Sequence, residues 1–325
     1  MHTRTLGRSG LEVSAIGLGC WAIGGPFWLD GKPVGWGEVD DDESVRAIHR
    51  ALELGATFFD TANVYGTGHS EEVLGRALAG RRDEVVIATK FGRTFDEASR
   101  TITGSDASPA TIRPACEASL RRLGTDRIDL YQLHLGDHEP SAAAEVRDVL
   151  EDLVSDGLIR AYGWSTDDPE RARVFAEGPH CAAVQHELNV LQDAPAMLEL
   201  CDAEGLASVN RTPLAMGLLT GKFDEASRLP GDDIRGDPPP WMRYFRDGRP
   251  AQEWLERLAS VREILASGGR SLAGGALGWI LARSSRTIPI PGFRTVAQVE
   301  ENLGALRHGP LTPEQLREID SLLGR

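Results

Sequence analysis

The sequence of 325 residues predicts a (β/α)8 barrel of the TIM type, and two observations support that fold class. Short apolar segments recur along the chain, and helical patterns separate them. Continuously apolar strands that alternate with helices indicate a parallel sheet covered on both faces. Eight such units in roughly 250 residues are typical of a (β/α)8 barrel. The competing fold, a doubly wound open sheet, is disfavoured because no Gly-x-Gly-x-x-Gly motif follows the first apolar segment.

The first strand is expected near Ile16, after a short N-terminal hairpin whose turn is Gly7-Arg8-Ser9-Gly10. Seven further strands are expected at residues 57–59, 85–88, 128–133, 161–163, 183–185, 207–209 and 287–290. Helices are expected between them, for example at residues 44–54, 71–78, 109–123, 142–154, 169–175 and 196–203. Cap signals mark helix starts at Ser108-Pro109, Asp168-Pro169, Thr295-x-x-Gln298 and Thr312-x-x-Gln315.

One long stretch, residues 223–252, departs from this alternation and is rich in Asp, Gly, Pro and Arg. It follows the seventh predicted strand, which places it on the catalytic face of a barrel. Loops this long are usually functional or disordered, so we expect a lid over a ligand, with a passive disordered loop as the alternative. No domain boundary or repeat is evident, and residues 1–325 are therefore expected to form a single barrel domain.

Composition narrows the class of partner. The chain has 49 acidic and 35 basic residues and a net charge of −14, which argues against a nucleic-acid partner or an anionic membrane surface. No apolar run is long enough to predict a membrane span, and the first residues lack the apolar core of a secretory signal. The cysteines, none in a Cys-x-x-Cys pair, fit reduced thiols and predict a cytoplasmic location.

Four polar residues follow the ends of predicted strands two, three and four. Asp60 and Lys90 end the second and third strands, His134 ends the fourth, and Tyr65 lies in the loop after Asp60. Side chains at the C-terminal ends of barrel strands converge on one pocket, and adjacent strands lie roughly 4.8 Å apart. We therefore expect these four side chains to meet. Lys90 stands out further because Lys32 and Lys222 are the other lysines of the chain.

A carboxylate, a phenol, an ammonium and an imidazole at one rim can form a proton donor. A free tyrosine has a pKa near 10, and a cation about 4 Å away is worth roughly 4 kcal/mol at an effective dielectric of 20. Lys90 is therefore expected to lower the pKa of Tyr65 toward 7, with Asp60 holding Lys90 and His134 orienting a carbonyl. Because no nucleophilic Ser or Cys motif is present, a hydride from a cofactor fits this acid best. A metal site at His134, Asp137, His138 and Glu139 is the disfavoured alternative, since its members crowd one loop.

These motifs resemble the aldo-keto reductase family, in particular its bacterial, NADPH-dependent members, over nearly the whole chain. The segments that carry the resemblance are Phe59-Asp60-Thr61-Ala62-x-x-Tyr65-Gly66, His69-Ser70-Glu71, Ile87-Ala88-Thr89-Lys90 and Tyr131-Gln132-Leu133-His134. The resemblance implies a (β/α)8 barrel that reduces aldehydes and ketones with NADPH, an enzyme of the alcohol dehydrogenase type. It also implies Tyr65 as the acid, Lys90 and Asp60 as its tuning pair, and His134 as the residue that orients the substrate.

The same resemblance implies a set of cofactor-binding residues. Ser165 and Gln185 match positions that contact the nicotinamide, the segment 212–222 matches a pyrophosphate loop, and residues 288–302 match the adenosine end. The implied residues are Trp21, Ser165, Gln185, Arg211, Pro213, Leu214, Gly217, Leu219, Gly221, Lys222, Gly292, Arg294, Thr295, Gln298, Glu301 and Asn302. Physical reasoning adds that a helix capped by Thr295 presents free backbone N–H groups, and that Arg294 suits a phosphate. Both favour the 2′-phosphate of NADPH over NADH.

Three positions depart from the family pattern: Thr166 replaces an asparagine, Leu135 replaces a tryptophan, and Arg211 replaces an aromatic residue beside the nicotinamide. We expect the charge of Arg211 to disfavour the oxidised cofactor. Candidate substrate-pocket residues are Trp21, Trp28, Phe91, Leu135, Trp241 and Tyr244. The favoured function is therefore NADPH-dependent reduction of a small-molecule carbonyl by a monomer or weak homo-oligomer. The alternatives are a non-catalytic NADPH-binding regulatory module and a metal-dependent hydrolase on the same barrel.

Overall fold

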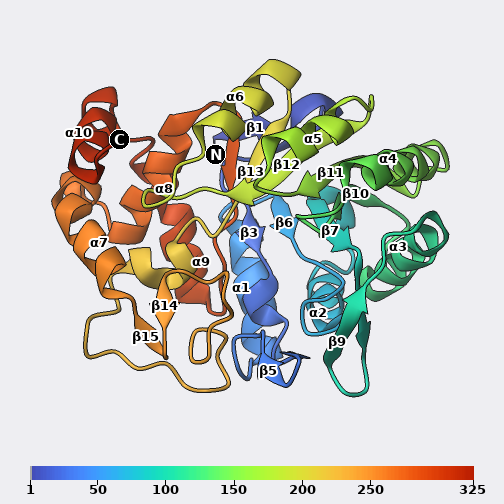
Figure 1. Ribbon diagram of the computed structural model, residues 1–325, viewed down its shortest axis with the longest axis horizontal. Helices are drawn as coiled ribbons and strands as arrows, with labels where there is room; N and C mark the ends of the chain where they lie inside the picture. The colour runs from blue at the N-terminus through green and yellow to red at the C-terminus, as the bar shows by residue number, and fades with distance from the viewer. Residues whose placement is uncertain (1) are drawn as a thin grey trace.

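The computed structural model describes residues 2–325, and within them eight parallel strands form a nearly closed barrel (Figure 1). In barrel order the strands are β3 (Leu18–Gly19), β6 (Phe58–Asp60), β7 (Val86–Phe91), β10 (Ile128–Leu133), β11 (Ile159–Ser165), β12 (Cys181–Glu187), β13 (Ala207–Arg211) and β16 (Thr287–Pro289). The gap between β16 and β3 is bridged by hydrogen bonds from Gly17 N to Pro289 O and from Gly19 N to Pro291 O, both 3.0 Å. The predicted fold class and strand positions are confirmed.

Helices surround this barrel, and their starts follow the predicted signals closely. They are α1 (Asp41–Glu53), α2 (His69–Ala77), α3 (Pro109–Leu123), α4 (Pro140–Ser155), α5 (Pro169–Ala176), α6 (Pro195–Glu204), α7 (Gln252–Leu265), α8 (Leu272–Arg283), α9 (Val296–Gly304) and α10 (Pro313–Leu323). Asp168 caps α5 by accepting from Glu170 N and Arg171 N, and Thr312 forms a complete capping box with Gln315.

Two of the predicted caps are only partly correct. Ser108 stands at the N-terminus of α3, but its hydroxyl makes no capping hydrogen bond within the described residues. Thr295 accepts from Gln298 N at the start of α9, so half of the expected capping box is present. The other half is absent from the described structure because the Gln298 side chain accepts from Arg294 N instead, at 2.7 Å.

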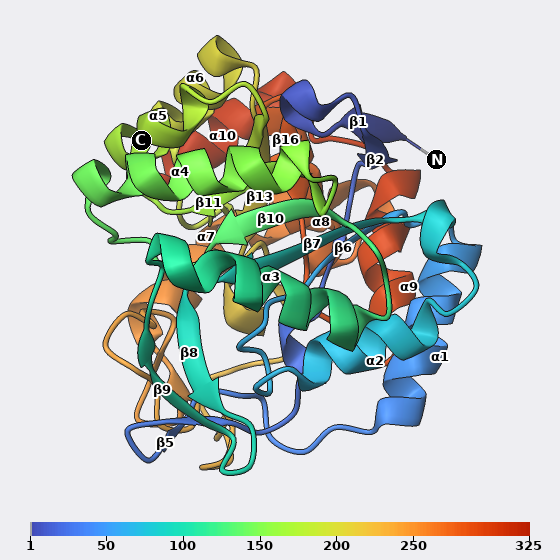
Figure 2. The same cartoon turned by 90° about the vertical axis from the view of Figure 1, so that its right-hand side faces the viewer.

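The predicted N-terminal hairpin closes the end of the barrel at which the strands begin. Strands β1 (Thr3–Thr5) and β2 (Glu12–Ser14) are antiparallel, and Figure 2 shows them on the far side of the barrel from β5 and β9. Leu6 and Val13 are fully buried against interior side chains such as Phe58 and Val209. The β1–β2 hairpin therefore closes this end of the barrel as a hydrophobic plug. The predicted rim residues lie at the opposite end.

A small sheet at that opposite end was not predicted. Strands β4 (Trp28–Leu29), β5 (Lys32–Pro33), β8 (Arg93–Asp96) and β9 (Thr101–Ser105) pair in the order β5-β4-β9-β8. They follow the C-terminal ends of the first and third barrel strands, so they extend the rim beside the site. Their side chains are mostly polar and half-buried or exposed, and they lack the continuous apolar run that marks a barrel strand.

The long stretch after the seventh strand is packed against the rim. It contains a short hairpin of β14 (Phe245–Arg246) and β15 (Arg249–Pro250), and Ile234 is fully buried. Arg235 pairs with Asp233 through two hydrogen bonds of 2.8 and 2.6 Å. These contacts do not fit a disordered loop, and the role of the stretch as a lid stays a prediction. No helix among residues 2–325 is both long and apolar enough to cross a lipid bilayer.

Gly7 offers a test of how the hairpin seals the barrel. Its φ is +52°, and a Cβ atom added there would lie 1.9 Å from the carbonyl oxygen of Ala182. Gly10 has a φ of +70° but no atom within 4 Å of the same position. We expect Gly10→Ala to lower the free energy of unfolding by about 1 kcal/mol through backbone conformation alone. Gly7→Ala is expected to lower it by about 3 kcal/mol, because the new methyl group also collides with backbone.

Chemical denaturation followed by circular dichroism measures both losses, and the thermal midpoints give an independent ranking. Equal losses in the two variants would contradict the close packing of the hairpin against β12.

Candidate active site

The barrel brings the four predicted rim residues together. Asp60 is the last residue of β6, Lys90 lies near the end of β7, and His134 directly follows β10. Parallel pairing places Asp60 beside Ala88, two residues before Lys90, and places Lys90 beside Gln132, two residues before His134, so the three side chains lie at the same end of neighbouring strands. Tyr65 reaches the same place from the loop between β6 and α2.

A buried ion pair forms the centre of the site. Lys90 Nζ lies 2.5 Å from Asp60 Oδ1, and the side chain of Lys90 is fully buried. The same ammonium group donates to the Thr61 carbonyl oxygen at 2.9 Å and to the Tyr65 hydroxyl oxygen at 3.2 Å. Burial alone would lower the pKa of Lys90, but the combined attraction and hydrogen bonds of Asp60 and Tyr65 outweigh it and hold the pKa above its ordinary value. Lys90 is therefore charged and fixed in direction.

Two glutamines complete the surroundings of Asp60. Its second oxygen, Oδ2, accepts from Gln132 Nε2 at 3.0 Å and from Gln185 Nε2 at 2.7 Å. Gln132 was not predicted. The sequence did contain a signal for it, because Gln132 lies two residues before His134 and strand side chains alternate in direction. Gln185 was expected to contact the nicotinamide, but here its amide donates to Asp60 at the bottom of the site.

The phenol of Tyr65 does not have the lowered pKa that we expected. Burial raises its pKa above the ordinary value, and the attraction of Lys90 counteracts this only in part. Asp60 also raises the pKa, because its carboxylate repels a phenolate. The expectation was wrong because it left out the burial of the phenol, which outweighs the attraction of Lys90, and the repulsion by Asp60 adds to the effect of burial. The phenol is therefore protonated at neutral pH.

His134 is held neutral beside the phenol. Its ring meets the Tyr65 ring edge-on, with centroids 5.8 Å apart and an interplanar angle of 84°. Burial, together with the positive charges of Lys90, Arg93 and Arg211, lowers the pKa of His134 well below its ordinary value. Its Nδ1 atom is buried and has no hydrogen-bond partner among the described residues. A neutral imidazole with an unused nitrogen can donate to or accept from a bound polar group.

An aromatic wall stands over Tyr65. The Trp21 ring stacks on the Tyr65 ring, with centroids 5.7 Å apart and planes inclined by 18°. Trp36 meets Trp21 edge-on at 5.4 Å, and Trp241 of the long stretch lies 6.4 Å from Trp21 with 58% of its surface exposed. Three other candidate pocket residues, Phe91, Leu135 and Tyr244, are buried in the packing. The aromatic lining of the opening is therefore made mainly of tryptophan.

The expected nicotinamide side contains an ion pair that the sequence did not reveal. Arg211 Nη2 donates to Asp167 Oδ2, so a carboxylate lies beside the charge that Arg211 was expected to bring. A cavity of about 360 Å³ lies here, lined in part by Ser165, Thr166, Asp167 and Arg211. Ser165 is nearly buried at the end of β11, and the Thr166 hydroxyl donates to the Gly136 carbonyl oxygen at 2.7 Å.

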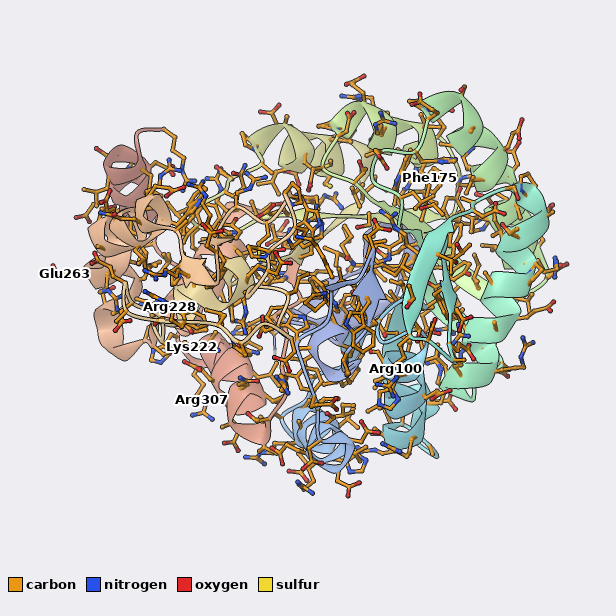
Figure 3. All side chains as sticks on the ribbon, turned by 60° about the horizontal axis from the view of Figure 1, so that its bottom comes forward. Arg100, Phe175, Lys222, Arg228, Glu263 and Arg307 are labelled. Atoms are coloured by element: carbon orange, nitrogen blue, oxygen red, sulfur yellow. The ribbon has the colours of Figure 1, made fainter. Side chains whose placement is uncertain are left out.

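The expected pyrophosphate loop has an unusual backbone. Ala215, Met216 and Gly217 have φ values of +47°, +57° and +91°, which for non-glycine residues indicates a strained turn. The side chains of Pro213, Leu214 and Leu219 pack inward, whereas Gly217 and Gly221 are half-buried. Lys222 is exposed beyond this turn, on the same side of the barrel as Arg228 (Figure 3). Partial desolvation and the repulsion of Arg235 and Arg294 lower its pKa.

The start of α9 differs from what was expected. The guanidinium of Arg294 donates to the Trp36 carbonyl oxygen at 2.9 Å and to the Glu38 carbonyl oxygen. Val296 N donates to Glu43 Oε1 at 2.9 Å, so this backbone N–H group is not free. Asn302 is buried and donates to the Gly292 carbonyl oxygen at 3.2 Å, whereas Glu301 is exposed.

Two features of the rim therefore fit a nicotinamide dinucleotide, and one feature does not. The neutral His134 ring beside the phenol fits a bound carbonyl group, and the positive charges of Arg235 and Arg294 near Lys222 fit phosphate groups. Glu43, which already accepts from Val296 N, does not fit beside a phosphate at the N-terminus of α9. Among residues 2–325, no group of three or more His, Cys, Asp or Glu side chains is arranged to hold a metal ion.

The pKa of Tyr65 can be measured directly. All four tyrosines of the chain, Tyr65, Tyr131, Tyr162 and Tyr244, have pKa values raised by burial. We expect little tyrosinate absorbance at pH 10, where an exposed tyrosine is half ionised. The difference in absorbance at about 295 nm between the wild type and Tyr65→Phe, followed against pH, isolates Tyr65. Lys90→Met is expected to move that step to still higher pH, because the attraction that stabilises the phenolate is lost. A step near pH 7 would contradict this account.

Comparison with known proteins agrees with this fold. A model of the Aldo/keto reductase family matches residues 15–323. The aldo-keto reductase YhdN of Bacillus subtilis (strain 168) is 33% identical over 328 residues, which cover 99% of this chain and 94% of the relative. The structure of the glycerol dehydrogenase AKR11B4 from Gluconobacter oxydans has a TM-score of 0.83 at 33% identity and covers 99% of this chain and 95% of its own.

A third similar protein was solved with a ligand. The aldo/keto reductase from Klebsiella pneumoniae in complex with NADP and acetate has a TM-score of 0.70 at 26% identity, covering 99% of this chain and 95% of its own. The family model and the sequence relative both extend over nearly the whole chain. This chain belongs to the aldo/keto reductase family.

Proposed function

We propose that this protein is an NADPH-dependent oxidoreductase that reduces an aldehyde or ketone to an alcohol, with Tyr65 as the general acid. One observation carries the proposal: a buried, charged lysine lies 3.2 Å from a protonated phenol that is placed at the mouth of the barrel. Membership of the aldo/keto reductase family, and a Klebsiella pneumoniae relative in complex with NADP, support the reaction class and the cofactor.

The proton comes from the Tyr65 hydroxyl. A carbonyl oxygen beside it accepts a hydrogen bond and then the proton, while His134, which is neutral, orients the same oxygen from the other side. A phenolate is left, and the ammonium group of Lys90 stabilises that negative charge as it forms. Asp60, held by Gln132 and Gln185, keeps Lys90 aimed at the phenol. Lys90 thus acts on the phenolate that forms in the reaction more than on the phenol at rest.

NADPH, when bound, supplies the hydride that reduces the carbonyl carbon. On this chain we assign its nicotinamide end to the cavity beside Ser165 and Arg211, and its phosphates to the loop that ends at Lys222. Trp21, which stacks on Tyr65, would keep water from the reacting carbonyl group. The proposed adenosine end consists of Gly292, Arg294, Thr295, Gln298, Glu301 and Asn302.

The second candidate function is a non-catalytic NADPH-binding regulatory module. It requires the cofactor site but no proton donor. The fully satisfied Asp60–Lys90 pair beside Tyr65 weighs against it, because burying an ion pair costs stability and a module without chemistry gains nothing from it.

Replacing Tyr65 separates the two functions. Tyr65→Phe removes the transferable proton and leaves the ring stacked on Trp21, so we expect kcat to fall by roughly 10²- to 10⁴-fold. The Kd for NADPH, measured by quenching of tryptophan fluorescence, should stay within about twofold because the ring still packs in place. The assay follows oxidation of NADPH in the presence of aldehydes and ketones.

Tyr131→Phe is a matched control. Its hydroxyl is buried without a hydrogen-bond partner in the described structure, and its ring stacks on Phe91 at 4.6 Å. Tyr131→Phe removes a phenolic hydroxyl group from β10 and leaves the four rim residues unchanged, so activity should be retained. Full activity in Tyr65→Phe would overturn the proposed mechanism. Tight NADPH binding with no turnover of any carbonyl compound by the wild type would instead favour the regulatory module.

A further inference from the structure

The start of helix α9 already carries a carboxylate from elsewhere in the chain. Glu43, in the first turn of α1, accepts from Val296 N through Oε1 at 2.9 Å. Its other oxygen, Oε2, accepts from Arg46 Nε and Nη2 at 3.1 and 2.9 Å. Both oxygens therefore have fixed partners, and the carboxylate is held at the helix terminus where backbone N–H groups and the helix dipole attract an anion.

The neighbouring cation is also engaged by the same part of the chain. Arg294 donates to the carbonyl oxygens of Trp36 and Glu38, which precede α1. Residues 36–43 thus accept hydrogen bonds from two groups near the start of α9 that could bind an anion, the guanidinium of Arg294 and the N–H group of Val296. Among residues 2–325 the guanidinium donates only to carbonyl oxygens, which are neutral, whereas Val296 N donates to a carboxylate with a full negative charge.

An incoming phosphate would face these two elements differently. Arg294 gains by exchanging neutral carbonyl oxygens for a phosphate, because hydrogen bonds between charged groups are the stronger ones. Val296 N–H cannot serve two anions, and Glu43 would repel a second negative charge placed beside it. The 2′-phosphate is the group by which NADPH differs from NADH, so this opposition acts on one cofactor and not the other.

We propose that Glu43 sets the cofactor preference of this protein by competing with the 2′-phosphate for the N-terminus of α9, thereby lowering the affinity for NADPH relative to NADH. This inference rests on the proposed function, which places the adenosine end of the cofactor at Arg294 and α9. It makes Glu43 a specificity-determining residue, although it lies on α1 and outside the motifs that carry the family resemblance.

Glu43 also joins α1 to α9, and a purely structural role must be distinguished from the proposed one. A second link between the same helices, Arg50 Nε to Glu300 Oε1 at 2.8 Å, provides the comparison. Glu43→Gln keeps a carbonyl oxygen that can accept from Val296 N and removes the charge. Glu300→Gln makes the same chemical change and weakens the same helix pair, but it leaves Val296 untouched.

The experiment compares the wild type, Glu43→Gln and Glu300→Gln by isothermal titration with adenosine 2′,5′-bisphosphate and with ADP, then with NADPH and NADH. We expect Glu43→Gln to tighten the binding of adenosine 2′,5′-bisphosphate and NADPH by about tenfold, because a charged competitor becomes a neutral one. ADP and NADH should change by less than about twofold, since neither carries the 2′-phosphate. Glu300→Gln should leave all four constants near the wild-type values. Thermal midpoints verify folding, and Glu43→Ala serves as the second variant.

The possible outcomes distinguish the assignment of Glu43 from the proposed function. Equal tightening of all four ligands in Glu43→Gln, or the same selective change in Glu300→Gln, would overturn the assignment of Glu43 and leave the proposed function intact. Unchanged ratios in both Glu43 variants would do the same. Failure of the wild type to bind any of the four ligands would overturn the proposed function and the assignment together.

Discussion

The site depends on a buried ion pair that, with its hydrogen-bond partners, joins four strands of the barrel. Lys90 is fully buried, and an isolated ammonium group cannot remain charged in such a place. It remains charged because Asp60 from β6 and the carbonyl oxygen of Thr61 surround it. Asp60 in turn is satisfied by amides from β10 and β12. Removing either partner would leave an uncompensated buried charge, which is far more destabilising than the pair itself.

This dependence explains why the barrel, and not any local segment, creates the chemistry. Four parallel strands must end at matching levels before two glutamines can reach one carboxylate. The same balance of charge has a consequence for the acid. Because the phenol is buried and Lys90 is paired with Asp60, the lysine does not make the resting phenol acidic, and its effect appears when the phenol loses its proton. The site therefore holds a protonated donor that becomes favourable to deprotonate only while a partner accepts the proton.

The sequence predicted the barrel well because its signals are local and repeated. Apolar strands, helix caps such as Asp168, and the hairpin turn at Gly7 each depend on neighbouring residues. It also predicted which four residues meet at the rim, since the ends of parallel strands converge. What it missed depends on contacts between distant segments. Arg294 and the carbonyl oxygen of Trp36 are 258 residues apart, and no spacing rule reports that contact. Arg211 was likewise assigned a free charge because Asp167, 44 residues away, was not visible as its partner.

The N-terminal plug has a consequence for the order in which the protein can be completed on the ribosome. Arg8 Nε contacts the carbonyl oxygen of Cys181 across 173 residues, and Arg4 Nη2 contacts that of Leu281 across 277. This segment is synthesised before those partners, so it must wait for them before its binding place exists. Contacts of such long range form late and slowly. Until those partners are made, the apolar side chains of Leu6 and Val13 lack native contacts, so this hairpin needs protection from aggregation during synthesis.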